Sequence, residues 1–404
     1  MKVQRFLARD RFPSLLARLE EAGYDVIGPQ VRDHAIVFDA LASVEALPRG
    51  ITDDQAPGRY RLAASSSDRY FDWATGPQAL KPLTFAPRET LWTSETRDDG
   101  TLVFRERLPE ARPTAVIGVR ACDLAALAIH DRHFLHGAAP DPHYRARREN
   151  LFLVAVNCAR SAATCFCTAT GDGPRVTHGH DLALGELDDG FVVEAHTDRG
   201  RELLATLDTS EATAEALAEV EAGLARAADQ QHRRLPAGSL PEQLQAAVAH
   251  PHWQDLDDRC LTCGNCTAVC PTCFCQTHVD AISLDGREAS HVRQWETCFN
   301  PDHSYIHGTV IRAERPQRYR QWLTHKFGTW VAQYGRSGCV GCGRCIAWCP
   351  VGIDVTEELA ALSQAPTNAP DEAPAPTPGR VPGTVPSKAQ GQAPAPNRRE
   401  GKDD

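Results

Sequence analysis

Two groups of cysteines in this sequence share one short spacing, C-x2-C-x2-C-x3-C followed by proline. The first group precedes Pro271 and consists of Cys260, Cys263, Cys266 and Cys270. The second precedes Pro350 and consists of Cys339, Cys342, Cys345 and Cys349. Two-residue spacers let three thiolates converge on three irons of one cubane, while the fourth reaches the other cluster in two-cluster ferredoxins. The doubled motif therefore predicts two 4Fe-4S clusters.

An exchange of fourth ligands is expected between the two motifs. One cluster would take Cys260, Cys263, Cys266 and Cys349, and the other Cys339, Cys342, Cys345 and Cys270. The intervening segment 271–338 is much longer than the connection in a small bacterial ferredoxin, so the exchange is an expectation that needs structural support. Structural zinc is the competing interpretation, but zinc sites usually use two C-x2-C pairs separated by a longer loop. The spacing favours cubanes.

Seven further cysteines lie outside the two motifs. Three are in the intervening segment, Cys273, Cys275 and Cys298, and four are in the first part of the chain, Cys122, Cys158, Cys165 and Cys167. The tetrapeptide TCFC occurs twice, at 164–167 and 272–275. Four alternatives stay open: a third cluster on the four early cysteines, a site shared by the two TCFC segments, a reactive thiolate beside Arg120 or Arg160, or buried thiols with no site.

Composition limits the classes of function. The chain has 404 residues, 15 of them cysteine, and a formal net charge of -10. An acidic balance disfavours nucleic-acid binding, and no apolar stretch approaches the length of a membrane span. Reduced thiols in such number indicate metal binding in a cytoplasmic protein rather than a disulfide framework. No G-x-G-x-x-G, P-loop or C-x-x-C-H motif occurs, so a nucleotide, flavin or c-type haem site of its own is not indicated.

Hydrophobic patterns outline the elements that must position these cysteines. Runs at 114–119 and 151–156 predict buried strands, and helices are expected at 12–22, 123–130 and 208–228, with 120–122 as a loop. The stretch 312–334 is expected to be helical in its latter part. Its basic residues are expected on a solvated face: Arg315, Arg318, Arg320 and Lys326.

These patterns predict an α+β multidomain protein. A mixed α/β domain over 1–235 and a polar linker over 236–252 would precede a helical ferredoxin-like dicluster domain over 253–362, with its long insertion between the motifs. The remainder, 363–404, is rich in Pro and Ala and lacks Leu, Ile and aromatic residues. It cannot bury a core, so a disordered tail is expected there.

The order of the motifs resembles a known family. The segments that carry the resemblance are GVRACDLAAL, NCARSAATCFCTATGDGP, CLTCGNCTAVCPTCFC, RYRQWLTHKFGTW and CVGCGRCIAWCP. Together they are similar to the 4Fe-4S dicluster beta subunit of cytoplasmic sulfhydrogenases and the A subunit of anaerobic sulfite reductases. In that family the eight motif cysteines match the cluster ligands position by position, and the similarity spans roughly residues 20 to 362.

The resemblance implies an electron-transfer subunit. It would relay electrons between a flavin-containing, NAD(P)H-reactive partner and a catalytic subunit, of hydrogenase or sulfite reductase type. Two 4Fe-4S clusters are implied, and a third is left open. The alternative is a thiol- or sulfur-active enzyme subunit that uses the early cysteines and is fed by the dicluster domain.

Overall fold

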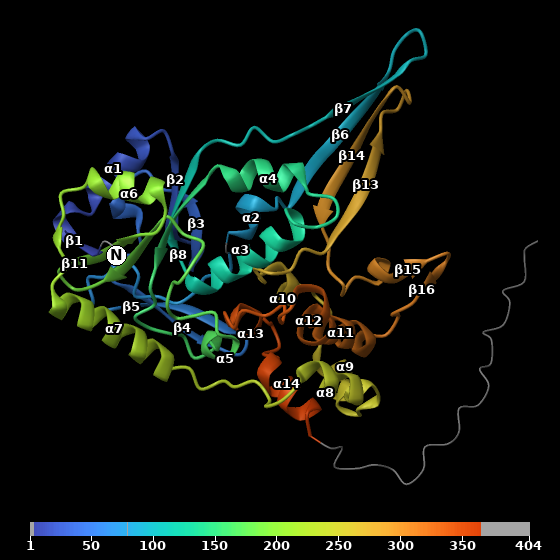
Figure 1. The fold of residues 1–404 in the computed structure, drawn as a ribbon. Coiled ribbons are helices and arrows are strands. Elements are labelled where there is room, and N and C mark those ends of the chain that lie inside the picture. Colours follow the sequence, from blue (N-terminus) through green and yellow to red (C-terminus); the bar gives the residue numbers. More distant parts are fainter. Residues whose placement is uncertain (1–3, 79, 365–404) are drawn as a thin grey trace, which may run out of the picture. The chain divides into compact units, whose positions relative to one another are not determined.

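An eight-stranded mixed sheet organises the first half of the chain (Figure 1). Its strand order is β12-β1-β11-β10-β9-β8-β2-β3. The strands are β1 (Gln4–Ala8), β2 (Asp25–Arg32), β3 (Ala35–Ala40), β8 (Thr114–Val119), β9 (Leu151–Val156), β10 (Leu182–Glu186), β11 (Gly190–Ala195) and β12 (Ser210–Glu211). The central strands β2, β8, β9 and β10 are parallel, and the outer pairs are antiparallel. The two predicted strands are β8 and β9, which lie at the centre of the sheet.

Alternate residues of β9 face two different hydrophobic clusters. Phe152 and Val154 pack in one cluster with residues of the first helix, whereas Leu151 and Leu153 pack in the other with Leu124. This two-sided burial explains why β8 and β9 read as unbroken apolar runs, as parallel strands covered on both faces do.

Helices flank this sheet, three of them near the predicted places, although the helix expected from residue 208 begins only at Ala214 because Ser210–Glu211 form strand β12. They are α1 (Pro13–Glu21), α2 (Lys81–Thr84), α3 (Ala121–Phe134), α4 (Pro142–Glu149), α5 (Cys167–Thr170), α6 (Asp198–Ala205) and α7 (Ala214–Asp229). The helix expected at 123–130 is the centre of α3, but α3 begins at Ala121. The expected loop at 120–122 is therefore wrong for Cys122, which lies in the helix because Asp123 accepts a hydrogen bond from the Arg120 N–H and caps its first turn.

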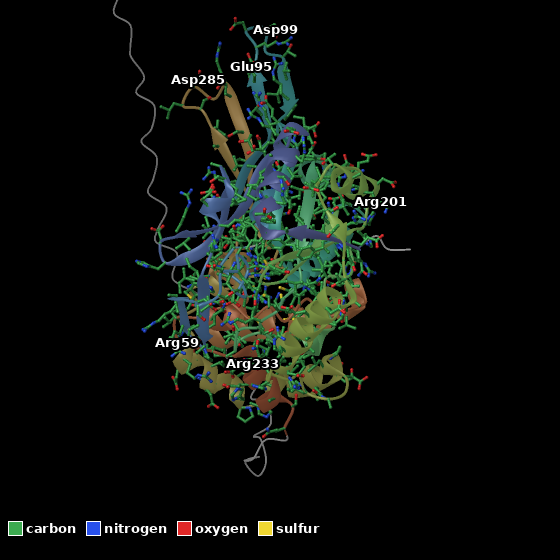
Figure 2. All side chains as sticks on the ribbon, turned by 90° about the vertical axis from the view of Figure 1, so that its left-hand side faces the viewer. Arg59, Glu95, Asp99, Arg201, Arg233 and Asp285 are labelled. Carbon is green, nitrogen blue, oxygen red and sulfur yellow. The ribbon has the colours of Figure 1, made fainter. Side chains whose placement is uncertain are left out.

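Three smaller antiparallel sheets complete the strands. The largest, in the order β13-β14-β6-β7, joins early strands to strands of the insertion. Its members are β6 (Arg88–Thr96), β7 (Leu102–Glu106), β13 (Gln276–Ile282) and β14 (Glu288–Trp295), and the two hairpins are β4 (Ile51–Ala56) with β5 (Arg59–Ala64) and β15 (Tyr305–Ile306) with β16 (Thr309–Val310). Figure 2 shows Asp99 and Asp285 at the same end of the four-stranded sheet.

The second half of the described chain is mainly helical. Its helices are α8 (Leu240–Ala246), α9 (His252–Arg259), α10 (Asn265–Ala268), α11 (Arg315–Thr324), α12 (Trp330–Tyr334), α13 (Arg344–Ala347) and α14 (Val355–Leu362), and a π-helical turn at His325–Thr329 joins α11 to α12. Short 3-10 turns lie at Arg9–Arg11, Val44–Ala46, Ala247–Ala249 and Pro301–Ser304. Leu244 of α8 is buried in the core of this half, so the segment expected as a polar linker is partly structured and packed.

The computed structural model describes residues 4–78 and 80–364, so nearly all of the expected tail at 363–404 lies outside the described residues. The described residues belong to one compact unit. The boundaries near 235 and 252 therefore stay predictions. No helix within these two ranges is long and apolar enough to cross a membrane.

Candidate metal centres

The two cysteine motifs fold in the same way. In each, a glycine with a left-handed backbone directly follows the second cysteine and begins a four-residue helix that carries the third. Gly264 has φ of 76° and precedes α10, and Gly343 has φ of 75° and precedes α13. Residues with a Cβ adopt this conformation only at a cost, so glycine lets both loops curl over a common centre. The repeated spacing thus becomes a repeated loop and helix.

The first expected centre would take the first three cysteines of one motif and the last of the other. One pocket is lined by Cys260, Cys263, Cys266 and Cys349 and also by Cys345 of the second motif, together with apolar side chains that include Phe299 and Trp322. Burial raises the pKa of the Cys266 thiol, and Cys260, Cys349 and Cys263 raise it further. Backbone N–H groups also point at sulfur: Thr262 N lies 3.4 Å from Cys260 Sγ, and Ile353 N lies 3.3 Å from Cys349 Sγ.

The second expected centre would take the first three cysteines of the second motif and the last of the first motif. Burial raises the pKa of Cys339 to about 12, and its neighbours include Cys342 and Cys270. The half-buried Cys345 lies near Cys339, Cys342 and Cys270. The Gly341 N–H donates to Cys339 Sγ at 3.4 Å. The grouping of Cys270 with the second motif and of Cys349 with the first supports the predicted exchange of fourth ligands, which stays a prediction at the level of individual residues.

The donor sets suit a cluster better than one ion. In the part of the chain that the structure describes, no group of three or more His, Cys, Asp or Glu side chains is placed to hold a single metal ion. The four thiolates of a cubane bind four different irons and therefore stand farther apart than the ligands of one ion. Four thiols around an apolar pocket, with N–H groups directed at their sulfurs, are the surroundings that such a cluster requires.

A buried lysine, which the sequence interpretation missed, adjoins the second centre. Lys326 is 5% exposed, and its Nζ lies 3.4 Å from Cys270 Sγ and 3.6 Å from Cys273 Sγ. Arg318, also expected on a solvated face, is buried and donates to the carbonyls of Arg312 and Ala313. The expectation is therefore wrong for these two residues. The apolar neighbours Leu323 and Phe327 were the sequence signal that Lys326 lies on an inward face.

A second buried lysine faces the cysteines of the insertion. Lys81 of α2 donates to the carbonyls of Thr267 and Ala268, and its Nζ lies 3.9 Å from the centre of the Trp295 ring. It lines a pocket with Cys273 and Cys275. Burial lowers the pKa of Lys81, whereas the nearby thiols of Cys273 and Cys270 oppose that change. Two buried ammonium groups thus stand beside thiols, where they would offset the negative charge of thiolate-bound clusters.

The two TCFC segments contact different neighbours. The Phe166 N–H of the first donates to the Gly341 carbonyl at 2.8 Å, within the second cysteine motif. In the second, Thr272 Oγ1 donates to the Gly338 carbonyl at 2.6 Å, and Cys273 lies beside Cys270. Cys298 lies beside Cys275. The structure therefore gives each TCFC segment its own surroundings, and the interpretation of one site shared by both receives no support from these contacts.

Comparison with known proteins agrees with the motif geometry. Residues 259–353 match the family of 4Fe-4S dicluster domains. This region is a 4Fe-4S dicluster domain. The chain is also 28% identical over 365 residues to sulfhydrogenase 2 subunit beta of Pyrococcus furiosus, an alignment that covers 87% of this chain and 96% of that protein. No solved structure matches the chain. The expected resemblance to sulfhydrogenase beta subunits and the expected α+β class with a dicluster domain are confirmed.

Proposed function

We propose that this chain is the iron-sulfur electron-transfer subunit of a multisubunit oxidoreductase. It would relay electrons between a flavin-containing, NAD(P)H-reactive partner and a catalytic subunit of hydrogenase or sulfite reductase type. The observation that supports the proposal is that the eight motif cysteines gather in the dicluster domain, with Cys266 near Cys349 and Cys345 near Cys270. Its likeness over most of its length to a protein named as a sulfhydrogenase subunit supports a role within an assembly.

The residues around the two sets perform three tasks. When bound, 4Fe-4S clusters accept and release single electrons without breaking bonds. Phe299, Tyr319 and Trp322 are buried beside the first set and exclude water from it. Backbone N–H groups and Lys326 would stabilise the more negative, reduced state. Cys266 of one set and Cys345 of the other are close enough for each set to influence the other, which suits transfer between neighbouring centres.

The electron donor and acceptor would belong to partners. The sequence has no nucleotide-binding motif of the kinds considered above, so NAD(P)H chemistry is assigned to a flavin-containing subunit. The eight motif cysteines are assigned as ligands, in the two exchanged sets of four. A cytoplasmic location, expected from the reduced cysteines, stays a proposal.

The test uses the full chain purified without oxygen. We expect dithionite to produce low-temperature EPR signals of reduced clusters, and NAD(P)H alone to produce none. Addition of the flavin-containing subunit that co-purifies with a tagged chain should make the clusters reducible by NAD(P)H. The proposal fails if the flavin-free chain is reduced by NAD(P)H directly, or if dithionite gives no cluster signal.

The geometry does not favour the alternative of a thiol-active enzyme subunit. Cys165 and Cys167 are 6% and 8% exposed. Burial raises the pKa of both thiols, that of Cys167 to about 12. A nucleophilic thiol requires access and a lowered pKa, and these two have neither.

A further inference from the structure

Four cysteines outside the dicluster domain are brought together by the parallel sheet. The carboxyl ends of β8 and β9 lie at one edge, since the two strands are parallel neighbours. Cys122 follows β8 in the first turn of α3, and Cys158 lies just beyond β9. Cys165 and Cys167 follow on the same connection and reach α5. This edge is where open α/β sheets place their ligand sites.

The four thiols form one group. Three of them are buried, Cys158 is half-buried, and all four are free of disulfides. Cys165 lies close enough to Cys167 and Cys158 to interact with both electrostatically. Cys122 lies close enough to interact with Cys342 of the second motif and with Cys167. Cys122 and Cys165 also pack against apolar side chains, which keeps water away from the group.

Polar and cationic groups are buried around these thiols. Arg120 is 1% exposed, its Nη1 lies 4.0 Å from Cys158 Sγ, and its Nε has no hydrogen-bond partner among the described residues. Gln231 is fully buried and donates from Nε2 to Cys167 Sγ at 3.3 Å. Arg120 Nη2 donates to the carbonyls of Phe71 and Trp73, and negative charge beside a buried guanidinium would stabilise it further. An anionic group on the four sulfurs would supply that charge and accept these donors.

The group adjoins the second centre of the dicluster domain. Besides the Phe166 hydrogen bond to Gly341, Cys165 Sγ lies 4.0 Å from the carbonyl oxygen of Cys342. A Cβ built on Gly341 would lie 2.5 Å from the backbone of Phe166 and Cys167, so the two loops are in direct backbone contact. Phe166 itself is buried in the core of the dicluster region. The early thiols therefore directly adjoin the loop that carries Cys342.

We propose that Cys122, Cys158, Cys165 and Cys167 bind a third iron-sulfur cluster, next to the one assigned to Cys339, Cys342, Cys345 and Cys270. The role of this cluster as an extension of the relay into the first half of the chain rests on the proposed function. The site itself does not, because it is argued from the four thiols and their buried donors.

The test counts iron and acid-labile sulfide per full chain after anaerobic purification. Each cubane contributes about four of each, so we expect about twelve in the wild type. Cys165→Ser and Cys167→Ser should each lower both counts by about four and remove one EPR signal. The matched control Cys298→Ser, a buried cysteine of the insertion, should retain the wild-type counts.

Three outcomes would overturn the third site. One is a wild-type count of about eight, which needs no variant and so holds even if a substitution prevents folding. Another is retention of about twelve by both Cys165→Ser and Cys167→Ser. The last is a loss in Cys298→Ser but not in the early variants, which would place the extra cluster in the insertion. Failure of the relay is distinguishable, because it would leave the iron count intact while the partner subunit no longer reduces the clusters.

Discussion

The cysteines of the dicluster domain differ in the groups that face their sulfurs. Cys260, Cys339 and Cys349 each accept a hydrogen bond from a backbone N–H, whereas Cys270 contacts Thr272 Oγ1 and accepts a hydrogen bond from the ammonium group of Lys326. Hydrogen bonds to sulfur stabilise the reduced cluster, and a charged donor does so more strongly than an amide. The two centres are thus expected to differ in reduction potential.

The exchange of fourth ligands can be tested residue by residue. We expect Cys349→Ser to alter the same EPR signal as Cys263→Ser, because both cysteines line the first centre. Cys270→Ser should alter the same signal as Cys342→Ser. EPR of the four reduced variants, recorded under identical conditions, decides the matter. If Cys349→Ser instead altered the signal that Cys342→Ser alters, each motif would bind its own cluster.

Lys326→Met should lower the reduction potential of the cluster assigned to Cys270. The substitution removes the ammonium group 3.4 Å from Cys270 Sγ and keeps an unbranched chain of similar volume. We expect a decrease on the order of 60 mV, which corresponds to a tenfold change for a one-electron couple. Potentiometric titration followed by EPR measures it.

Arg320→Met is the matched control for this titration. It removes a positive charge from α11, the helix that leads into the turn containing Lys326, but Arg320 donates to the Val248 carbonyl rather than to sulfur. Its potentials should stay near those of the wild type. Equal shifts in the two variants would mean that net charge, and not the contact with Cys270, sets the potential.

At the scale of elements, local sequence patterns were sufficient to predict strands in which consecutive residues are buried. The runs at 114–119 and 151–156 predict β8 and β9 because each residue of those strands is covered on both faces. Strand β14 pairs with β6, about two hundred positions away in the sequence, and no local periodicity reveals that pairing. Strand β13 pairs with β14 in a local hairpin, which the sequence interpretation also missed. The eight motif cysteines could be predicted because their spacing is a local pattern in the sequence. The contact of Lys326 with Cys270 could not, because these two residues are far apart in the sequence.

Gly341→Ala should separate the first TCFC loop from the second motif. A Cβ at this position would lie 2.5 Å from the backbone of Phe166 and Cys167, and φ is 63°. The left-handed conformation costs about 1–2 kcal/mol and overpacking about 1–3 kcal/mol more. We expect a lower apparent unfolding temperature together with loss of iron, measured by circular dichroism and iron analysis on the same samples.

Gly171→Ala controls for backbone strain alone. Its φ is 74°, but no atom lies within 4 Å of the added Cβ. This variant should show only the smaller destabilisation and keep its iron. Equal iron loss in both variants would mean that strain, not the contact between the loops, explains the effect of Gly341→Ala.

At the scale of the molecule, each half of the chain packs an aromatic side chain against the other half. Phe166, from the first half, is buried in the core of the dicluster region. Phe274, from the insertion, stacks on His133 of α3 with ring centres 3.8 Å apart. Buried ion pairs add to these contacts: Arg344 of α13 pairs with Asp123 of α3 at 2.8 Å, and Arg233 pairs with Asp354 at 2.6 Å. Because each half completes the core of the other, we expect them to unfold together.

The substitution Asp123→Asn tests whether the two halves unfold together. Asp123 and Arg344 have side chains 2% and 1% exposed, so the substitution leaves a buried guanidinium without its counter-charge, at a cost of about 3–5 kcal/mol. The amide oxygen can still accept the Arg120 N–H, which keeps the cap of α3. The matched control is Glu21→Gln, which breaks the exposed pair with Arg18 and should cost less than about 1 kcal/mol.

The measurement is made by heating the anaerobic, cluster-loaded variants. Far-ultraviolet circular dichroism reports the unfolding transition, and the visible absorbance reports loss of the clusters. In Asp123→Asn both transitions should move to lower temperature by the same amount, because the ion pair joins the helix after β8 to the loop that holds Cys342 and Cys345. A fall in the temperature of cluster bleaching together with only part of the far-ultraviolet change, the remainder staying at the wild-type temperature, would mean that the dicluster domain opens alone. The first half would then be a separately stable domain, as the predicted boundary near residue 235 implies, and coupling between the halves would lie in the loops rather than in a shared core.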